Sequence, residues 1–192
     1  MKKIILASQS PRRRELMEML AMPFEVLVSD KEEIIKSTNP KEVTEELSRQ
    51  KAEAVAETTD NGIIIGADTV VACDGKILGK PRDKKDAYDT IHSLQGRSHM
   101  VYTGVTIICK GNGDKQIRTF SEGTKVKVSK MNEDEIRAYI ETDEPYDKAG
   151  AYGIQGTFGK FIEGIEGDFY NVVGLPVSRL YREIRNLLLT EK

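Results

Sequence analysis

The sequence predicts a mixed α/β protein built on one elongated, twisted β-sheet with helices packed against it. Two observations lead to this fold class. Early in the chain, apolar runs of strand length alternate with helix signals, which is typical of parallel strands joined by helices. In the middle of the chain, turn signals such as Asp74-Gly75 join strand-like runs directly, which is typical of antiparallel hairpins. The sheet should therefore contain both kinds of pairing.

The first elements follow from short local signals. The run from Lys3 to Ala7 is apolar on both faces and predicts a strand buried in a covered sheet. Ser10 suits a helix N-cap, and Pro11 suits the first helical position after it. The apolar stripe of this helix is predicted to consist of Leu16, Met19 and Leu20.

The remaining elements are predicted from the same cap, turn and periodicity signals. They are, in chain order, a strand over 24–28, a helix from Asn39-Pro40 to about 57, strands over 62–73 and 76–78, a helix from Asp83 to Gly96, strands over 100–109 and 115–128 joined by the "GNGD" turn, a helix from Asn132 through 140, a strand-like stretch over 161–173 broken at "EGD", and a last helix opened by Pro176. Asn132 with Glu135 three residues later resembles a capping box.

The totals describe a folded globular protein without a general affinity for nucleic acid. The chain has 192 residues, of which 39% are hydrophobic and 31% charged, enough for a single domain over 1–192, compact or split into two lobes around a cleft. A net charge of −2 confines any basic site to a local patch. Cys73 and Cys109 have no metal-like spacing and predict reduced thiols in the cytoplasm. The run Ile4–Ala7 is too short for a signal peptide, and no later run approaches a membrane span.

The stretch "LASQSPRRRELMEML" places three arginines at a helix N-terminus, where the helix dipole disfavours cations. A bound polyanion would resolve the conflict at Arg12 and Arg13. The free N–H groups of the first turn and the hydroxyls of Ser8 and Ser10 would bind such an anion together with the arginines. The alternative is a solvated basic turn held by nearby acidic side chains.

Two charged residues interrupt apolar patterns. Asp68 lies within the apolar run over 62–73, where a carboxylate needs a counter-charge, a metal or a catalytic role, unless it only makes turn hydrogen bonds at the strand end. Lys51 falls inside the apolar arc of the helix that starts at Pro40. It either extends its ammonium group past that arc to water or directs it into an anion-binding cleft.

A glycine-rich stretch, "EPYDKAGAYGIQG", surrounds four polar residues, Asp147, Lys148, Tyr152 and Gln155. Glycines let the backbone approach a ligand closely, so this stretch is a candidate binding segment; the alternative is a flexible connector. Lys80 in "LGKPRD" is a weaker candidate, since its position between a hairpin and a helix also suits an exposed side chain.

Taken together, "LASQSPRRRELM", "EELSRQKAEAVA", "IIIGADTVVACDGKILGKPRD" and "DEPYDKAGAYGIQG" closely resemble the Maf family, in order and over nearly the whole chain. The resemblance implies a nucleoside triphosphate pyrophosphatase with two lobes around a central cleft and a fold related to the inosine triphosphate pyrophosphatases. The variants "SPRRR", "GADT" and "GIQG" look like the subgroup that acts on dTTP and UTP, and not like the one that acts on 7-methyl-GTP.

The resemblance also implies roles for individual residues. It marks Asp68 as the proton acceptor and Arg12, Thr69 and Gln155 as specificity positions, and it directs Arg12 and Arg13 at the triphosphate. The other polar positions that it places in the cleft are Ser8, Glu33, Lys51 and Lys80.

A divalent cation, Mg²⁺ or Mn²⁺, is implied as cofactor, with Glu33 and Asp68 as its expected ligands. The expected reaction is hydrolysis between the α and β phosphates, which would clear noncanonical or excess pyrimidine nucleotides. The expected assembly is a homodimer. The alternative function is a nucleotide-sensing protein that regulates septum formation without turnover.

Overall fold

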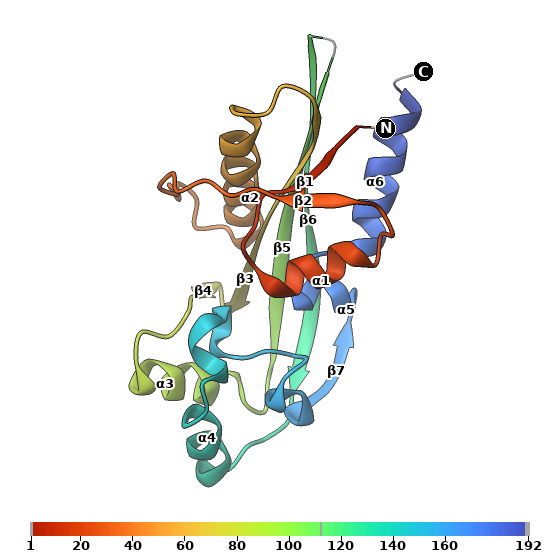
Figure 1. The fold of residues 1–192 in the computed structure, drawn as a ribbon. Coiled ribbons are helices and arrows are strands. Elements are labelled where there is room, and N and C mark those ends of the chain that lie inside the picture. Colours follow the sequence, from red (N-terminus) through yellow and green to blue (C-terminus); the bar gives the residue numbers. More distant parts are fainter. Residues whose placement is uncertain (1, 112, 191–192) are drawn as a thin grey trace.

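The computed structural model describes residues 2–111 and 113–190, which form a seven-stranded mixed sheet (Figure 1). The strands are β1 (Ile4–Leu6), β2 (Phe24–Val26), β3 (Gly62–Cys73), β4 (Lys76–Leu78), β5 (Ser98–Gly111), β6 (Asp114–Val128) and β7 (Ile162–Glu166). Their order is β2-β1-β3-β5-β6-β7, with β4 paired to β3. The strand β1 is parallel to β2 and β3, and all other pairings are antiparallel. The predicted fold class is confirmed.

Helices cover both faces of this sheet. They are α1 (Pro11–Glu18), α2 (Pro40–Ala56), α3 (Lys84–Leu94), α4 (Glu133–Ile140), α5 (Phe169–Val173) and α6 (Val177–Thr190), together with three short 3₁₀ helices, η1 (Glu144–Asp147), η2 (Ala149–Ala151) and η3 (Thr157–Phe161). No helix within the described residues is long and apolar enough to cross a membrane.

The alternation of side chains along β3 assigns each helix to a face. Ile63 and Ile65 belong to a core cluster with α1 and α6, whereas Ile64 belongs to a cluster with α2. Successive side chains of a strand point to opposite faces, so an uninterrupted apolar run is what a strand covered on both sides requires.

The long strands β3, β5 and β6 run through two lobes. One lobe contains α1, α2 and α6. At the other end of the same strands lie α3 and α4 (Figure 1). They pack with the 3₁₀ helices around a second core cluster, which includes the fully buried Phe158. Two cores on one sheet give the elongated, two-lobed shape that the family resemblance implies.

Two glycines bring α2 unusually close to the sheet. A Cβ atom on Gly66 would lie 2.2 Å from the backbone oxygen of Ser48, and a Cβ atom on Gly104 would lie 2.2 Å from that of Thr44. The backbone of α2 therefore rests directly on the β3–β5 pair. This close packing places the side chain of Lys51 next to Asp68.

Two details of the sequence prediction are wrong. Met19 is 52% exposed, and Met17, which is fully buried, takes its place in the apolar stripe of α1. The two residues flank the line of Leu16 and Leu20 on opposite sides of the helix, and the side of Met17 faces the core. The strand-like stretch over 161–173 stops at Glu166, because Asp168 accepts a hydrogen bond from the backbone N–H of Tyr170 and caps α5. In the predicted "GNGD" turn, residue 112 lies outside the described residues.

Candidate active site

A cleft of about 750 Å³ lies between the two lobes. Its volume is typical of a site for a small molecule. It is lined by all nine residues to which the family resemblance gives a role, which are Ser8, Arg12, Arg13, Glu33, Lys51, Asp68, Thr69, Lys80 and Gln155. Ser8 comes from the β1–α1 turn, Arg12 and Arg13 from α1, Glu33 from the loop before α2, and Lys51 from α2 itself. Asp68 and Thr69 come from β3, Lys80 from the loop after β4, and Gln155 from the segment around 147–156, so distant parts of the chain converge on one site.

Asp68 lies in the middle of β3, paired in register with Gly104 of β5. Its side chain is 15% exposed, and its Oδ1 accepts a hydrogen bond of 2.5 Å from Nζ of Lys51. The alternative of an aspartate that makes turn hydrogen bonds at the strand end is therefore wrong. A carboxylate at mid-strand is tolerated here because a cation compensates its charge.

Lys51 points into the cleft and not past the apolar arc to bulk water. Its side chain is 22% exposed, and its Nζ lies 2.5 Å from Asp68 and 3.2 Å from Oε1 of Glu33. The ammonium group thus lies between two carboxylates that come from different elements. This arrangement decides between the two alternatives for Lys51 in favour of the cleft.

Glu33 is carried by the extended segment between β2 and α2, and α2 holds that segment in place. The side-chain amide of Gln50 makes two hydrogen bonds with the backbone of Ile34, donating to its carbonyl oxygen at 2.7 Å and accepting from its N–H at 2.9 Å. Gln50 precedes Lys51, so the same turn of α2 fixes the segment and supplies the cation for Glu33. No sequence signal singles out Gln50.

Arg13 is anchored by three hydrogen bonds to protein groups. Its Nε donates to the carbonyl oxygen of Gly174 at 2.9 Å, and its two terminal nitrogens donate to Oγ of Ser8 at 3.2 Å and Oγ1 of Thr69 at 3.0 Å. Burial lowers the pKa of Arg13, while the nearby charge of Asp68 acts against that effect. A guanidinium group stays protonated at any physiological pH, so Arg13 is a fixed positive charge.

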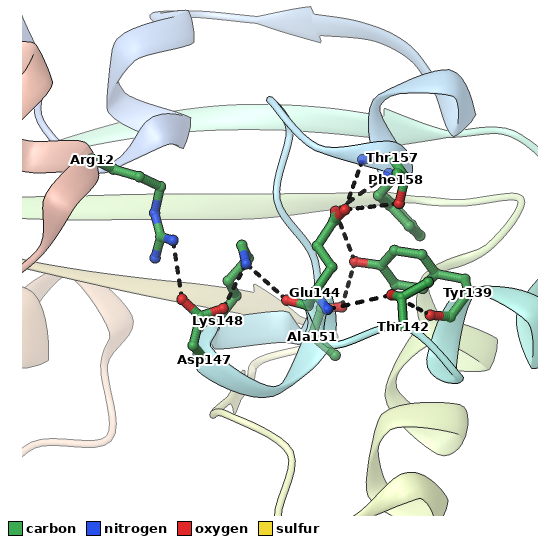
Figure 2. A network of polar contacts seen from close by, with 9 residues as sticks. All are labelled: Arg12, Tyr139, Thr142, Glu144, Asp147, Lys148, Ala151, Thr157 and Phe158. Atoms are coloured by element: carbon green, nitrogen blue, oxygen red, sulfur yellow. Dashed lines mark hydrogen bonds and ion pairs between the residues drawn. The ribbon is translucent and has the colours of Figure 1, made fainter.

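Arg12 reaches toward the other lobe (Figure 2). Its guanidinium group lies 3.3 Å from Oδ2 of Asp147, and the other oxygen of Asp147 accepts a hydrogen bond of 2.5 Å from Nζ of Lys148. The alternative of a basic turn held by nearby acidic side chains therefore applies to Arg12, which pairs with Asp147, whereas Arg13 is held by hydroxyl and carbonyl groups. Arg13 is anchored within the cleft, and Arg12 bridges it.

The remaining predicted residues differ in how firmly they are held. Oγ1 of Thr69 lies 2.9 Å from Oγ1 of Thr103, so a hydrogen bond between the two hydroxyls holds the Thr69 side chain in place. Lys80 and Gln155 are exposed and line the cleft. Gln155 lies in a turn that a hydrogen bond of 3.1 Å closes from the N–H of Gly156 to the carbonyl oxygen of Gly153.

Glu33 and Asp68 together fit two ligand positions of a divalent cation, but they do not make a complete metal site from protein groups alone. Within residues 2–111 and 113–190, no group of three or more His, Cys, Asp or Glu side chains is arranged to hold a metal ion. Glu33 and Asp68, however, already face one cation, the ammonium group of Lys51. Magnesium prefers oxygen ligands and commonly takes one or two carboxylates, with phosphate oxygens and water completing its shell.

Residues 3–187 match the family model described as Maf-like protein. The chain is 52% identical over 183 residues to a dTTP/UTP pyrophosphatase of Carboxydothermus hydrogenoformans, covering 95% of this chain and 97% of that protein. It is 50% identical over 186 residues to a dTTP/UTP pyrophosphatase of Bacillus anthracis, covering 96% and 95% of the two chains.

A solved structure, a nucleoside-triphosphatase described as a dITP/XTP pyrophosphatase from Mycobacterium abscessus, aligns with 97% of this chain and 98% of its own. Its TM-score is 0.48 and its sequence identity 14%, a likeness too weak to support an inference. The family model and the two close relatives each cover almost the whole chain and agree with one another. The protein is a member of the Maf family.

Proposed function

We propose that this protein hydrolyses dTTP and UTP, and modified pyrimidine nucleoside triphosphates, between the α and β phosphates, releasing the nucleoside monophosphate and pyrophosphate. The observation that carries the proposal is the carboxylate of Asp68, held by Lys51 in a cleft that is otherwise rich in cations. A cleft built only to bind a triphosphate gains nothing from a carboxylate unless a metal ion lies between the two, whereas hydrolysis needs a group that accepts a proton from water. The two relatives at about 50% identity carry the name of this activity.

In this mechanism, the cations stabilise the charge of the α-phosphoryl group and of the departing pyrophosphate. Arg13 is the most rigid of them because three hydrogen bonds fix its guanidinium group. Lys51 and Lys80 reach the cleft from different elements, which lets them contact different parts of a triphosphate chain. Asp68 positions the attacking water and accepts its proton.

Glu33 and Asp68 would hold a divalent cation, Mg²⁺ or Mn²⁺. When bound, the cation would neutralise phosphate charge and lower the pKa of a bound water. Lys51 then has a second role, because its ammonium group keeps the two carboxylates together when no metal or nucleotide is bound.

Base selection is assigned to Arg12, Thr69 and Gln155. The amide of Gln155 offers both a donor and an acceptor, which suits the alternating carbonyl and N–H groups on the edge of uracil or thymine. The enzyme is further proposed to work as a homodimer in the cytoplasm, where it would remove excess or modified pyrimidine nucleotides.

The test is a panel of nucleoside triphosphates assayed for pyrophosphate and for phosphate, each with Mg²⁺ and with Mn²⁺. We expect pyrophosphate release from UTP and dTTP, at higher kcat/KM than from CTP, ATP or GTP. Tight binding of UTP without release of any product would instead favour a nucleotide-sensing protein, and the proposed activity would be wrong.

A further inference from the structure

Glu144, at the start of η1, contacts the segment that follows the Gln155 turn (Figure 2). One of its carboxylate oxygens accepts hydrogen bonds from the backbone N–H of Thr157 at 2.7 Å and from Oγ1 of Thr157 at 2.8 Å. The other accepts from the backbone N–H of Phe158 at 3.4 Å and from the hydroxyl of Tyr139 at 3.2 Å. All four donors converge on one half-buried side chain.

These contacts make Glu144 the N-terminal cap of η3, supplied by another element. The first N–H groups of a helix have no partner within the helix, and Gly156, the residue at the cap position, has no side chain to satisfy them. Partial burial raises the pKa of Glu144, but the hydrogen bonds from Thr157, Phe158 and Tyr139 outweigh that effect and hold its pKa below the usual range. The carboxylate is therefore ionised whenever the protein is at neutral pH.

The same carboxylate also packs directly against the Gln155 turn. A Cβ atom on Gly156 would lie 2.3 Å from Oε1 of Glu144 and 2.4 Å from its Cδ, so the two groups are as close as a glycine allows. The turn that contains Gln155 is thus closed by its own hydrogen bond, and Glu144 holds the backbone that directly follows it. The turn cannot shift toward η1 while that carboxylate is present.

The backbone carbonyl group of Glu144 is connected to Arg12 through two other residues. Its carbonyl oxygen accepts a hydrogen bond of 2.8 Å from Nζ of Lys148, which also donates to Asp147. Asp147 in turn pairs with Arg12 of α1. One continuous series of contacts therefore joins Arg12 to Thr157, two residues after Gln155 (Figure 2).

We propose that Glu144 is a positioning residue for base recognition, which fixes the Gln155 turn from behind and, through Lys148 and Asp147, places it relative to Arg12. Glu144 does not line the cleft and touches no substrate in this role. The inference rests on the proposed function, because it assigns Gln155 and Arg12 to the recognition of a pyrimidine base. Its consequence is that base selectivity depends on a residue outside the binding surface.

The experiment compares the ratio of kcat/KM for UTP to that for CTP in Glu144→Ala, Glu144→Gln and the parent protein. In Glu144→Ala, we expect this ratio to fall by about tenfold or more, mainly through a higher KM for UTP, because a loosened turn costs binding and leaves Asp68 in place. Glu144→Gln keeps the shape but turns one acceptor into a donor, so an intermediate fall is expected.

Glu135→Ala is the matched control. Glu135 also caps a helix, α4, in the same lobe, where its carboxylate accepts a hydrogen bond from the N–H of Asn132. We expect Glu135→Ala to lower the melting temperature and to leave the UTP-to-CTP ratio unchanged. A purely structural Glu144 would behave in the same way, so an unchanged ratio in Glu144→Ala would overturn the inference.

A second comparison adds Glu144→Ala to Gln155→Ala. If Glu144 acts through Gln155, the double variant should have the same ratio as Gln155→Ala alone, and a further multiplicative fall would contradict the inference.

If Glu144→Ala does not fold, Glu144→Gln decides by the same ratio of kcat/KM for UTP to that for CTP. A parent protein that releases no pyrophosphate from UTP would refute the proposed function, and this inference with it. A normal parent with an unchanged ratio in both Glu144 variants would refute the inference alone.

Discussion

Lys51 is held between two carboxylates, so its removal should cost both turnover and stability. Lys51→Met replaces the ammonium group with an apolar end of similar length and leaves Asp68 and Glu33 facing each other. We expect kcat/KM with UTP to fall by about a hundredfold. The free energy of unfolding should fall by about 1–2 kcal/mol, between the values for exposed and buried ion pairs.

Urea unfolding without nucleotide and steady-state kinetics with UTP measure the two effects. The control is Lys127→Met, which removes an exposed lysine paired with Glu163. It should stay close to the parent in stability and keep its kinetics. If Lys51→Met were as active as the parent, Lys51 would be only the counter-charge of Asp68, and the cations at the triphosphate would be Arg12, Arg13 and Lys80.

His99 should make the protein less stable as the pH falls. It is 3% exposed, its Nε2 lies 2.7 Å from the hydroxyl of Tyr152, and burial lowers its pKa from 6.5 to about 4. In the unfolded chain, the imidazole takes up a proton as the pH falls through 6.5. In the folded protein, it does so only near pH 4, so the unfolded state is favoured across that window.

The variant His99→Gln removes this titration and can keep a hydrogen bond to Tyr152. Between pH 7.5 and pH 5, the parent should lose about 2 kcal/mol more stability than His99→Gln does, because each pH unit below 6.5 is worth about 1.4 kcal/mol. Urea unfolding of both proteins at the two pH values measures this difference. Equal losses would mean that His99 titrates normally in the folded protein.

At the scale of single residues, the sequence predicts which side chains enter the cleft but not what holds them there. Asp68 and Lys51 are visible because each interrupts an apolar pattern, and such conflicts tend to mark functional sites. Gln50 and Glu144 interrupt nothing. Each is an ordinary polar residue near a helix terminus or on a helix surface, and its importance comes from backbone groups that only the folded chain brings near.

At the scale of elements, the position of α2 on the sheet depends on two glycines. Gly104→Ala would place a Cβ atom 2.2 Å from the carbonyl oxygen and 2.3 Å from the carbonyl carbon of Thr44, both backbone atoms that cannot rotate away. We expect a loss of about 3 kcal/mol in the free energy of unfolding. The kcat with UTP should also fall, because α2 carries Lys51 and must move outward.

The control for this prediction is Gly164→Ala in β7, where a Cβ atom would meet nothing within 4 Å. That variant should stay within about 0.5 kcal/mol of the parent and keep its activity. Thermal and urea unfolding of both variants measure the comparison. A Gly104→Ala variant as stable as Gly164→Ala would mean that α2 does not rest directly on the β3–β5 pair.

The elements themselves are largely predictable, because N-caps, turn residues and apolar periodicity are local. The errors occur where a local signal is ambiguous. The stretch over 161–173 is rich in Phe, Tyr and Val, which favour strands, yet Asp168 caps a short helix in its second half. Similarly, Met17 and Met19 are equally apolar and flank Leu16 and Leu20 on opposite sides of the helix, so only the tertiary position of α1 decides which of them is buried.

At the scale of the whole molecule, the mixed sheet with helices on both faces is predictable, but the construction of the cleft is not. The same long strands carry two separate cores, and the cleft opens where one core gives way to the other, at Asp68 and Thr69. No periodicity in the sequence reports that change. The contact between Arg12 and Asp147, 135 residues apart, is equally invisible to local reasoning.

The most direct test of the central claim is the product analysis of UTP hydrolysis by the parent protein and by Asp68→Asn. Asparagine keeps the shape of the side chain but neither accepts a proton nor carries its charge. The parent should form UMP and pyrophosphate in equal amounts. The folded variant should still bind UTP, but its turnover should be lower by about a hundredfold or more. Formation of UDP and phosphate by the parent, or near-normal turnover by a folded Asp68→Asn variant, would contradict the account.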